Sequence, residues 1–150
     1  MAYRNIVKIG EELLRKKSRP VEEFNDKLAI ILDDMADTMY KADGCGLAGP
    51  QIGLLRRIIV CDYGDGIVEM VNPVILEASG KIGGQEGCLS IPGKRGYVER
   101  YDTLRVQWQT RKGVTKTKTF KGFPAVVLQH EIDHLEGILF IDRAISEDRN

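Results

Sequence analysis

The chain has 150 residues, 43% of them hydrophobic and 29% charged, and its 22 basic residues balance its 22 acidic residues. This composition is typical of one globular domain, and the balanced charge gives no electrostatic reason to expect nucleic acid or an anionic membrane as a partner. No apolar run approaches the ~20 residues of a membrane-spanning helix, and the residues from Met1 to Asn5 lack the apolar core of a secretory signal. We therefore expect residues 1–150 to form one cytoplasmic domain.

The first strong element is a helical pattern from about Val21 to about Lys41. Pro20 suits the first turn of a helix, and the Asp43-Gly44 pair suits its end. Apolar residues recur in this range at intervals of three and four, which places them on one helix face. They are Phe24, Leu28, Ile31, Leu32, Met35 and Met39. The pattern predicts a long N-terminal helix.

Strand-like runs follow the glycine-rich loop of residues 44–53, at residues 57–63, 67–72, 74–78, 104–109 and 114–121. In the last of these runs, Lys116 and Lys118 are expected to protect a sheet edge. The stretch between Gly83-Gly84 and Pro92-Gly93 is expected to be rich in loops. A final helix is expected from Pro124 to Leu135 or Glu136, with Gly137 at its end.

The order of these elements favours an α+β fold. Short connections between successive strands suit antiparallel sheets, whereas parallel sheets would need helices between the middle strands. We expect mostly antiparallel β-sheets packed around the final helix as a central element, together with the long N-terminal helix.

The final helix carries the pattern HExxH, which is typical of metal sites. His130 and His134 are the only two histidines of the chain, and their spacing of four places them on one helix face. Both can therefore bind one metal ion, and Glu131 can take a proton from a metal-bound water. The alternative is a pair of histidines satisfied on an ordinary helix. Burying these groups in an apolar helix without a partner would be costly, which favours the metal.

A catalytic site of this kind normally has a third protein ligand and one open position. Cys61 lies in an apolar strand and is expected in the core, whereas Cys88 and Cys45 lie in glycine-bounded segments. Spacing favours Cys88 and leaves Cys45 open. If both thiols joined the histidines, the site would be a closed structural one in an interaction module. A small metallopeptidase that cuts internal peptide bonds is the other alternative, but it gives Cys88 and Gln51 no role.

Three segments together resemble the peptide deformylase family. Gly44–Gln51 looks like the family's first motif, GxGLAxPQ, Glu86–Ser90 matches the second, EGCLS, and Gln129–His134 matches the third, QHExDH. They occur in the family's order and span well over half of the chain. One departure is Gly49, where many members have Ala; the change removes a methyl group, which could loosen the loop, and touches no chemical group.

The resemblance implies a metal-dependent hydrolase that removes the formyl group from the N-terminal formyl-methionine of newly synthesised polypeptides and releases formate. The metal ligands that it implies are Cys88, His130 and His134. A metal-bound water would be the nucleophile and Glu131 the general base and acid. The Gln51 side chain and the Leu89 backbone N–H would stabilise the oxyanion. The implied ion is Fe²⁺ in the cell, with Zn²⁺, Ni²⁺ or Co²⁺ as alternatives.

The substrate is expected beside the metal. By resemblance, Gly46 should hydrogen-bond the substrate main chain. Val126 and Val127 precede His130 by four and three positions, so they share its face and could wall an apolar pocket for methionine, although plain core packing is the alternative. Other residues expected at this pocket are Cys45, Phe123 and Leu89. Arg95 follows the second motif and could reach peptide backbone or a carboxylate downstream of the methionine.

The surroundings of the site can be anticipated only in outline. A metal-ligating histidine usually donates its other ring N–H to a partner, for which Glu86 and Asp133 are candidates. The resemblance implies N-formylmethionyl nascent polypeptides as partners, near the ribosome, with neither direct nucleic-acid binding nor a membrane. Formylated initiation is bacterial, so the expected setting is the bacterial cytoplasm.

Overall fold

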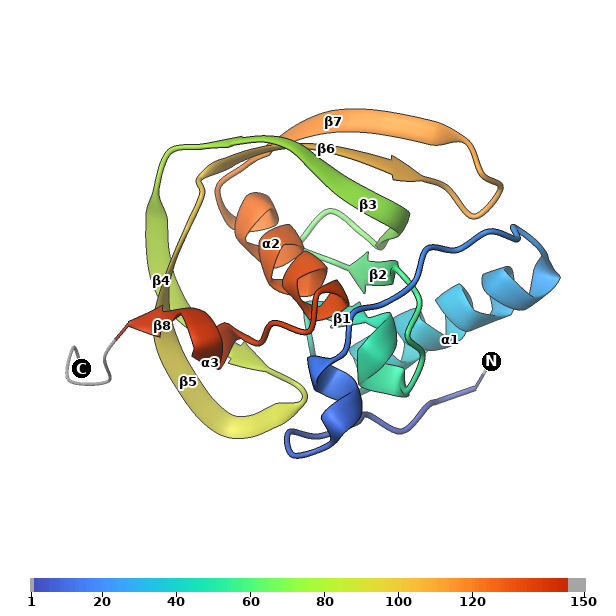
Figure 1. Cartoon of the computed structure of the whole chain (residues 1–150), viewed down its shortest axis with the longest axis horizontal. Coiled ribbons are helices and arrows are strands. Elements are labelled where there is room, and N and C mark those ends of the chain that lie inside the picture. Colours follow the sequence, from blue (N-terminus) through green and yellow to red (C-terminus); the bar gives the residue numbers. More distant parts are fainter. Residues whose placement is uncertain (1, 146–150) are drawn as a thin grey trace.

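Figure 1 shows a computed structural model of the chain, in which residues 2–145 are described. Met1 and residues 146–150, which belong to the expected domain, lie outside the described residues. Two antiparallel sheets and two main helices make up the described chain. The expected α+β class with antiparallel sheets is confirmed. None of the helices in residues 2–145 is long and apolar enough to cross a membrane.

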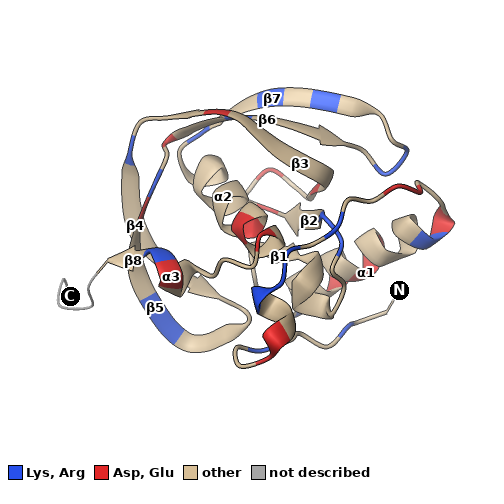
Figure 2. Cartoon of the chain, in the orientation of Figure 1, with Lys and Arg blue, Asp and Glu red and all other residues tan. Residues whose placement is uncertain are grey.

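The larger sheet has five strands in the order β1-β2-β3-β6-β7. Their bounds are Gly46–Ala48 for β1, Ile58–Cys61 for β2, Val68–Ser79 for β3, Thr103–Gln109 for β6 and Thr115–Lys121 for β7. The two strands expected at residues 67–72 and 74–78 are one strand, β3, because register shifts absorb the irregular pattern around Asn72 and Pro73. Lysines are spaced along β7, which is an edge strand (Figure 2). Lys116 and Lys118 are exposed there.

The smaller sheet has the order β4-β5-β8, with bounds Ile82–Cys88, Ile91–Arg100 and Ala144–Ile145. The expectation of a loop-rich stretch at residues 83–93 was therefore wrong. One of the glycines in β4 makes room for a side chain of the neighbouring strand. A Cβ at Gly83 would collide with the ring of Tyr97 on β5. Glycine punctuation was read as a sign of loops, although it also marks a strand that a neighbour approaches closely.

Helix α1 spans Asp26–Lys41 and packs on β1 and β2. It starts five residues later than expected, because Asn25 caps it: the Asn25 side chain accepts a hydrogen bond from the Leu28 N–H at 3.1 Å. Its apolar face contributes four buried side chains to a core shared with both strands. They are Leu28, Leu32, Met35 and Met39.

Helix α2 spans Phe123–Leu135 and lies inside the curve of the two sheets (Figure 1). Five of its side chains pack into the core under β2, β3 and β6. They are Ala125, Val127, Leu128, Ile132 and Leu135. The opposite side of α2 faces β4 and β5. The short helices are η1 at Glu12–Arg15, η2 at Gly49–Ile52 and α3 at Phe140–Arg143.

Candidate metal centre

The structure brings one thiol to the two histidines. Cys88 ends strand β4, and His130 and His134 lie one turn apart on α2. One ligand atom from each residue lies within 4.8 Å of the others, and no other such group of His, Cys, Asp and Glu occurs in residues 2–145. Cys88 Sγ lies 3.4 Å from His134 Nε2. The two other thiols are elsewhere: Cys45 is exposed and Cys61 is fully buried in the core of β2.

A carboxylate orients the first imidazole. His130 Nδ1 lies 2.9 Å from Glu86 Oε1, which leaves Nε2 free to face the other ligand atoms. Glu86 is gripped in turn by Arg100, whose Nε and Nη2 both donate at 2.8 Å. Burial alone would raise the pKa of Glu86, but Arg100 and His130 lower it to about 2. Glu86 is therefore a fixed anion that accepts a hydrogen bond from the His130 Nδ1–H.

The electrostatics of the two imidazoles differ. Burial lowers the pKa of His134 to about 3, with help from His130 and Arg100, so this ring is neutral and has a free lone pair. Burial also acts against charge on His130, but Glu131, Cys88 and Glu86 raise the pKa of His130 well above its usual value. Surroundings that hold a proton on an imidazole are negative, and they equally favour a bound cation.

Glu131 points its carboxylate at the same place. Its Oε2 lies 4.0 Å from His130 Nε2, and burial raises the pKa of Glu131 to about 7. Within residues 2–145, Glu131 Oε1 is buried without a hydrogen-bond partner. A buried carboxylate oxygen without a donor is costly unless the site supplies one. A thiol, two imidazoles and this unpartnered oxygen fit a divalent ion with an open position beside a base.

Gln51 reaches the group from η2 and is almost fully buried, with 1% exposure. Its Nε2 donates to Ser90 Oγ at 3.1 Å and lies 3.5 Å from Cys88 Sγ, while its Oε1 accepts from the Ala48 N–H at 2.9 Å. The side chain thus closes the turn after β1 with its oxygen. The same contact turns its amide protons toward Cys88.

The two glycine-containing segments touch each other beside the thiol. Leu89 follows Cys88, and its side chain covers Gly44 so closely that a Cβ there would collide with it. Gly49 lies behind them, where a Cβ would stand 2.7 Å and 2.9 Å from the carbonyl oxygens of Arg56 and Leu54. The loop at Gly49 is therefore tightly packed, and the lack of a methyl group does not loosen it.

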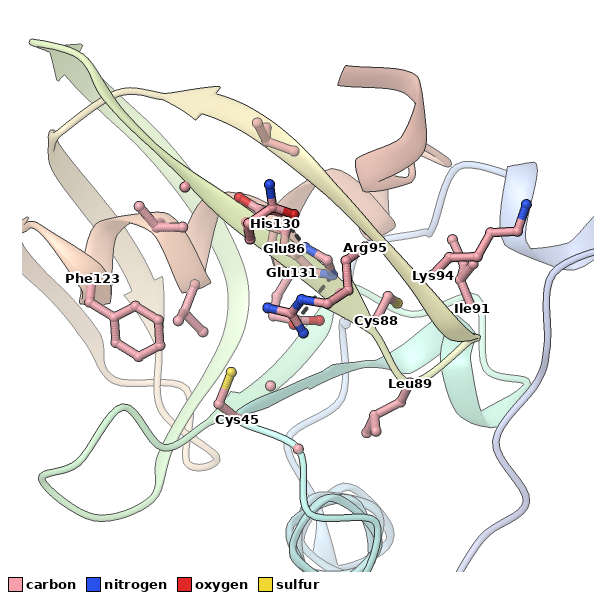
Figure 3. Close-up of a pocket in the computed structure, with 18 of the residues that line it drawn as sticks. Cys45, Glu86, Cys88, Leu89, Ile91, Lys94, Arg95, Phe123, His130 and Glu131 are labelled. Carbon is pink, nitrogen blue, oxygen red and sulfur yellow. Dashed lines mark hydrogen bonds and ion pairs between the residues drawn. The ribbon is translucent and has the colours of Figure 1, made fainter. Parts of the chain in front are cut away.

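A cavity of about 650 Å³ opens over the centre, between α2, the β4–β5 hairpin and the loop before β1. Phe123 stands at one end with 55% exposure, and Cys45 and Leu89 lie along one side (Figure 3). Val126 is half-buried in its wall, whereas Val127 also belongs to the core under the large sheet. Arg95 extends from β5 over the mouth of the cavity (Figure 3).

Some surrounding residues were not anticipated. Ser90 lies inside the second motif but was given no role. Arg100 carries a buried charge in a strand, and no pattern in the sequence marks it. Asp133 was a candidate partner for a histidine; instead it accepts hydrogen bonds from Arg100 and Arg143, because its carboxylate lies on the side of α2 that faces these guanidinium groups.

Comparisons with known proteins identify related sequences and folds. The sequence matches the profile of the polypeptide deformylase family over residues 3–150. It is 50% identical to a peptide deformylase of Caldanaerobacter subterraneus subsp. tengcongensis, over 97% of this chain and 91% of that one. The fold is similar to the crystal structure of peptide deformylase from Thermotoga maritima, with a TM-score of 0.96 and 39% identity over 97% of this chain and all of that chain. It is also similar to a Met-Ala-Ser-bound class I type b peptide deformylase from Acinetobacter baumannii, with a TM-score of 0.91 and 38% identity over 95% and 98% of the two chains.

Proposed function

Since the chain belongs to the polypeptide deformylase family, whose members are metal-dependent hydrolases, we propose that it carries out the family reaction at Cys88, His130 and His134. The chain is a hydrolase that removes the formyl group from the N-terminal formyl-methionine of nascent polypeptides. The observation that carries the assignment of the site is the thiol and two imidazoles within 4.8 Å of one another, beside the buried carboxylate of Glu131.

The three ligands would hold one divalent ion. A soft thiolate with two imidazoles suits several first-row metals, and we propose Fe²⁺ in the cell, with Zn²⁺, Ni²⁺ or Co²⁺ as substitutes. When bound, the ion would supply a Lewis acid that lowers the pKa of a water molecule and polarises the formyl group. Glu86 supports this assignment, because it fixes the tautomer of His130 and leaves Nε2 as the donor atom.

Glu131 is proposed as the general base and then the general acid. Its carboxylate would take a proton from the attacking water as oxygen bonds to the formyl carbon. As the C–N bond breaks, the same carboxyl group would deliver that proton to the leaving amine, so that formate and a free amino terminus are released. Burial places the pKa of Glu131 at about 7, where a group can both accept and return a proton near neutral pH.

Negative charge grows on the formyl oxygen during attack, and neutral donors can stabilise it. We propose the Gln51 side-chain amide and the Leu89 backbone N–H for this role. The amide protons of Gln51 are turned toward Cys88, and Leu89 is the residue that follows Cys88. Both donors therefore belong to the two segments that meet at the thiol.

The cavity is proposed to bind the first residues of the substrate. Gly46 lies on the short strand β1 beside Glu131, where its backbone could pair with the substrate main chain. Val126, Val127, Phe123, Cys45 and Leu89 would surround the methionine side chain. Arg95 would bind the peptide backbone or a carboxylate farther along. The Met-Ala-Ser complex of the Acinetobacter relative supports a tripeptide at this site.

The wider assignments follow from the same premise. We propose that residues 1–150 form a single metallohydrolase domain built around α2, with α1 as its long N-terminal helix. N-formylmethionyl nascent polypeptides are the substrates, and we propose that they are met near the ribosome in the bacterial cytoplasm. Bacterial relatives support this setting.

Formate release tests the proposal directly. Protein loaded with Fe²⁺ or Co²⁺ under anaerobic conditions is incubated with formyl-Met-Ala-Ser, and formate is measured. Met-Ala-Ser-containing peptides without the formyl group serve as the control for cleavage of internal peptide bonds. We expect formate from the first substrate and no new amino termini from the second. Metal-loaded protein that yields no formate would overturn the assignment, and cleavage of the unformylated peptides would favour a metallopeptidase.

A further inference from the structure

The short helix α3 contacts the metal-site histidine directly. Phe140, which is 2% exposed, stacks on the imidazole of His130 with ring centroids 6.0 Å apart and planes 22° from parallel. Helix α3 follows α2 by only four residues, and β8 after it pairs with Tyr97 and Val98 of β5. Helix α3 is therefore fixed by α2 before it and by the β8–β5 pair after it, and its Phe140 ring contacts His130.

A second connection runs from the surface of α3. Arg143 Nε donates to Asp133 Oδ2 at 2.6 Å, and its Nη2 donates to Oδ1 at 3.1 Å. The same Asp133 Oδ2 accepts from Arg100 Nη1 at 2.8 Å. One carboxylate thus joins two guanidinium groups, of which Arg143 has 45% side-chain exposure and Arg100 only 3%.

The connection continues inward without a break. Arg100 holds both oxygens of Glu86, and Glu86 Oε1 also lies 2.9 Å from His130 Nδ1. Four successive hydrogen-bonded links therefore lead from a surface arginine to a metal ligand. In order, they join Arg143, Asp133, Arg100, Glu86 and His130.

We propose that Phe140 and Arg143 are positioning residues of the metal centre, which hold the imidazole of His130 in its ligating orientation through the ring stack and through this relay. The inference rests on the proposed metal site. Asp133 and Glu86 each bind two partners, so a carboxylate that loses one of its donors is free to turn and to shift the next residue of the relay. A partly exposed ion pair adds little to folding stability, so the effect of Arg143 should appear at the metal rather than in unfolding.

The same turn offers a matched control. Asp142, next to Arg143 in sequence, pairs with Arg15 of η1, and within residues 2–145 no hydrogen bond joins this pair to the relay. Arg15 and Arg143 have similar side-chain exposure, 46% and 45%. Replacing either residue removes one surface ion pair from α3, but only Arg143 leads to His130.

The test measures metal retention. Co²⁺-loaded wild type, Arg143→Met, Arg143→Lys, Arg15→Met and Phe140→Leu are mixed with excess EDTA, and loss of the cobalt absorption bands is followed. Partners of metal ligands typically change affinity by 10- to 100-fold, so for a more distant residue we expect release about three to ten times faster in Arg143→Met. Arg15→Met should match wild type, Arg143→Lys should restore part of the loss, and Phe140→Leu should release cobalt faster.

Coupling to Glu86 decides whether the relay carries the effect. In a Glu86→Gln background, Arg143→Met should have no further effect on release. Equal release from Arg143→Met and Arg15→Met, or an unchanged Arg143→Met effect in the Glu86→Gln background, would overturn the relay. Arg143 is at the surface, so this result stands even if Phe140→Leu does not fold. Wild type that binds no Co²⁺ would instead overturn the proposed metal site.

Discussion

The carboxylate of Glu131 lies directly against the bare Cα of Gly46. Strand β1 passes α2 so closely at this point that a Cβ on Gly46 would collide with Glu131 Oε2. Gly46 has an ordinary φ, so its lack of a side chain serves the contact rather than the backbone conformation. The carboxylate of the proposed base therefore fits at this position only because Gly46 has no side chain.

Gly46→Ala should therefore displace the proposed base. The added methyl group would push the Glu131 carboxylate away from His130, and a misplacement of about 1 Å can reduce turnover about 100-fold. We expect kcat for formate release to fall 10- to 100-fold, as a rough range, with metal content unchanged. Elemental analysis and the formate assay check this together. Full activity in Gly46→Ala would show that the carboxylate tolerates the shift.

Glu131→Ala should retain the metal and lose turnover, because the carboxylate is proposed to move protons and not to bind the ion. Loss of a general base typically lowers the rate about 10²- to 10⁴-fold. Glu136→Ala is the matched control, since Glu136 follows the same helix and pairs with Arg57 and Lys17 instead. That variant should keep its turnover. Unchanged activity in Glu131→Ala would contradict the proposed mechanism.

Cys88 and Cys61 should respond differently to substitution. Cys88→Ala should greatly weaken metal binding, because a thiolate ligand is removed. Cys61→Ala should keep the metal and lose about 1 kcal/mol of folding stability, since Cys61 is fully buried in the core. Chelator competition and urea unfolding separate the two effects. Metal loss in Cys61→Ala but not in Cys88→Ala would show that Cys61, and not Cys88, is the metal ligand.

Acid should weaken the attachment of the N-terminal segment to α1. Asp34 accepts hydrogen bonds from the Ala2 N–H and from Arg4 Nε and Nη2. Burial would raise the pKa of Asp34, but Arg4 and the Ala2 N–H lower it below its ordinary 3.8. A carboxyl group with a lowered pKa in the folded state stabilises the fold above the unfolded value and loses this effect as pH falls through the folded value.

Urea unfolding between pH 6 and pH 3 measures this contribution. Asp34→Asn should lose less stability than wild type on acidification, and it should be the less stable protein at pH 6. Asp33→Asn is the control, because Asp33 lies on the same helix with 60% side-chain exposure. Parallel stability curves for wild type and Asp34→Asn would contradict the expectation.

Part of the site could be anticipated because two of its residues share one helix and the others lie in segments that match the family's motifs. Helical spacing alone pairs His130 with His134, and the resemblance adds Cys88. The carboxylate and guanidinium groups behind them could not be placed, because Glu86, Arg100 and Asp133 come from two strands and a helix whose register no local pattern determines. Phe140 is a further case, since an apolar residue shortly after a helix gives no sign that it will stack on an imidazole.

The fold was anticipated less evenly. The α+β class follows from the order of elements, but two local signals were misread. Glycines in β4 indicated a loop, although Gly83 makes room for Tyr97 in a strand pair. Pro20 placed the predicted start of the first helix too early, because the Asn25 side chain caps the helix and determines where it begins.

The ligands that meet in one place are made far apart in time. Cys88 precedes His134 by 46 residues, and Phe140, which stacks on His130, comes later still, in α3. Synthesis proceeds from the N-terminus, and emerging chains fold as their parts become available. An ion that meets the growing chain early would find the thiol alone. The complete set of proposed ligands therefore exists only once the chain has been translated through His134, so all three could hold an ion only late in synthesis.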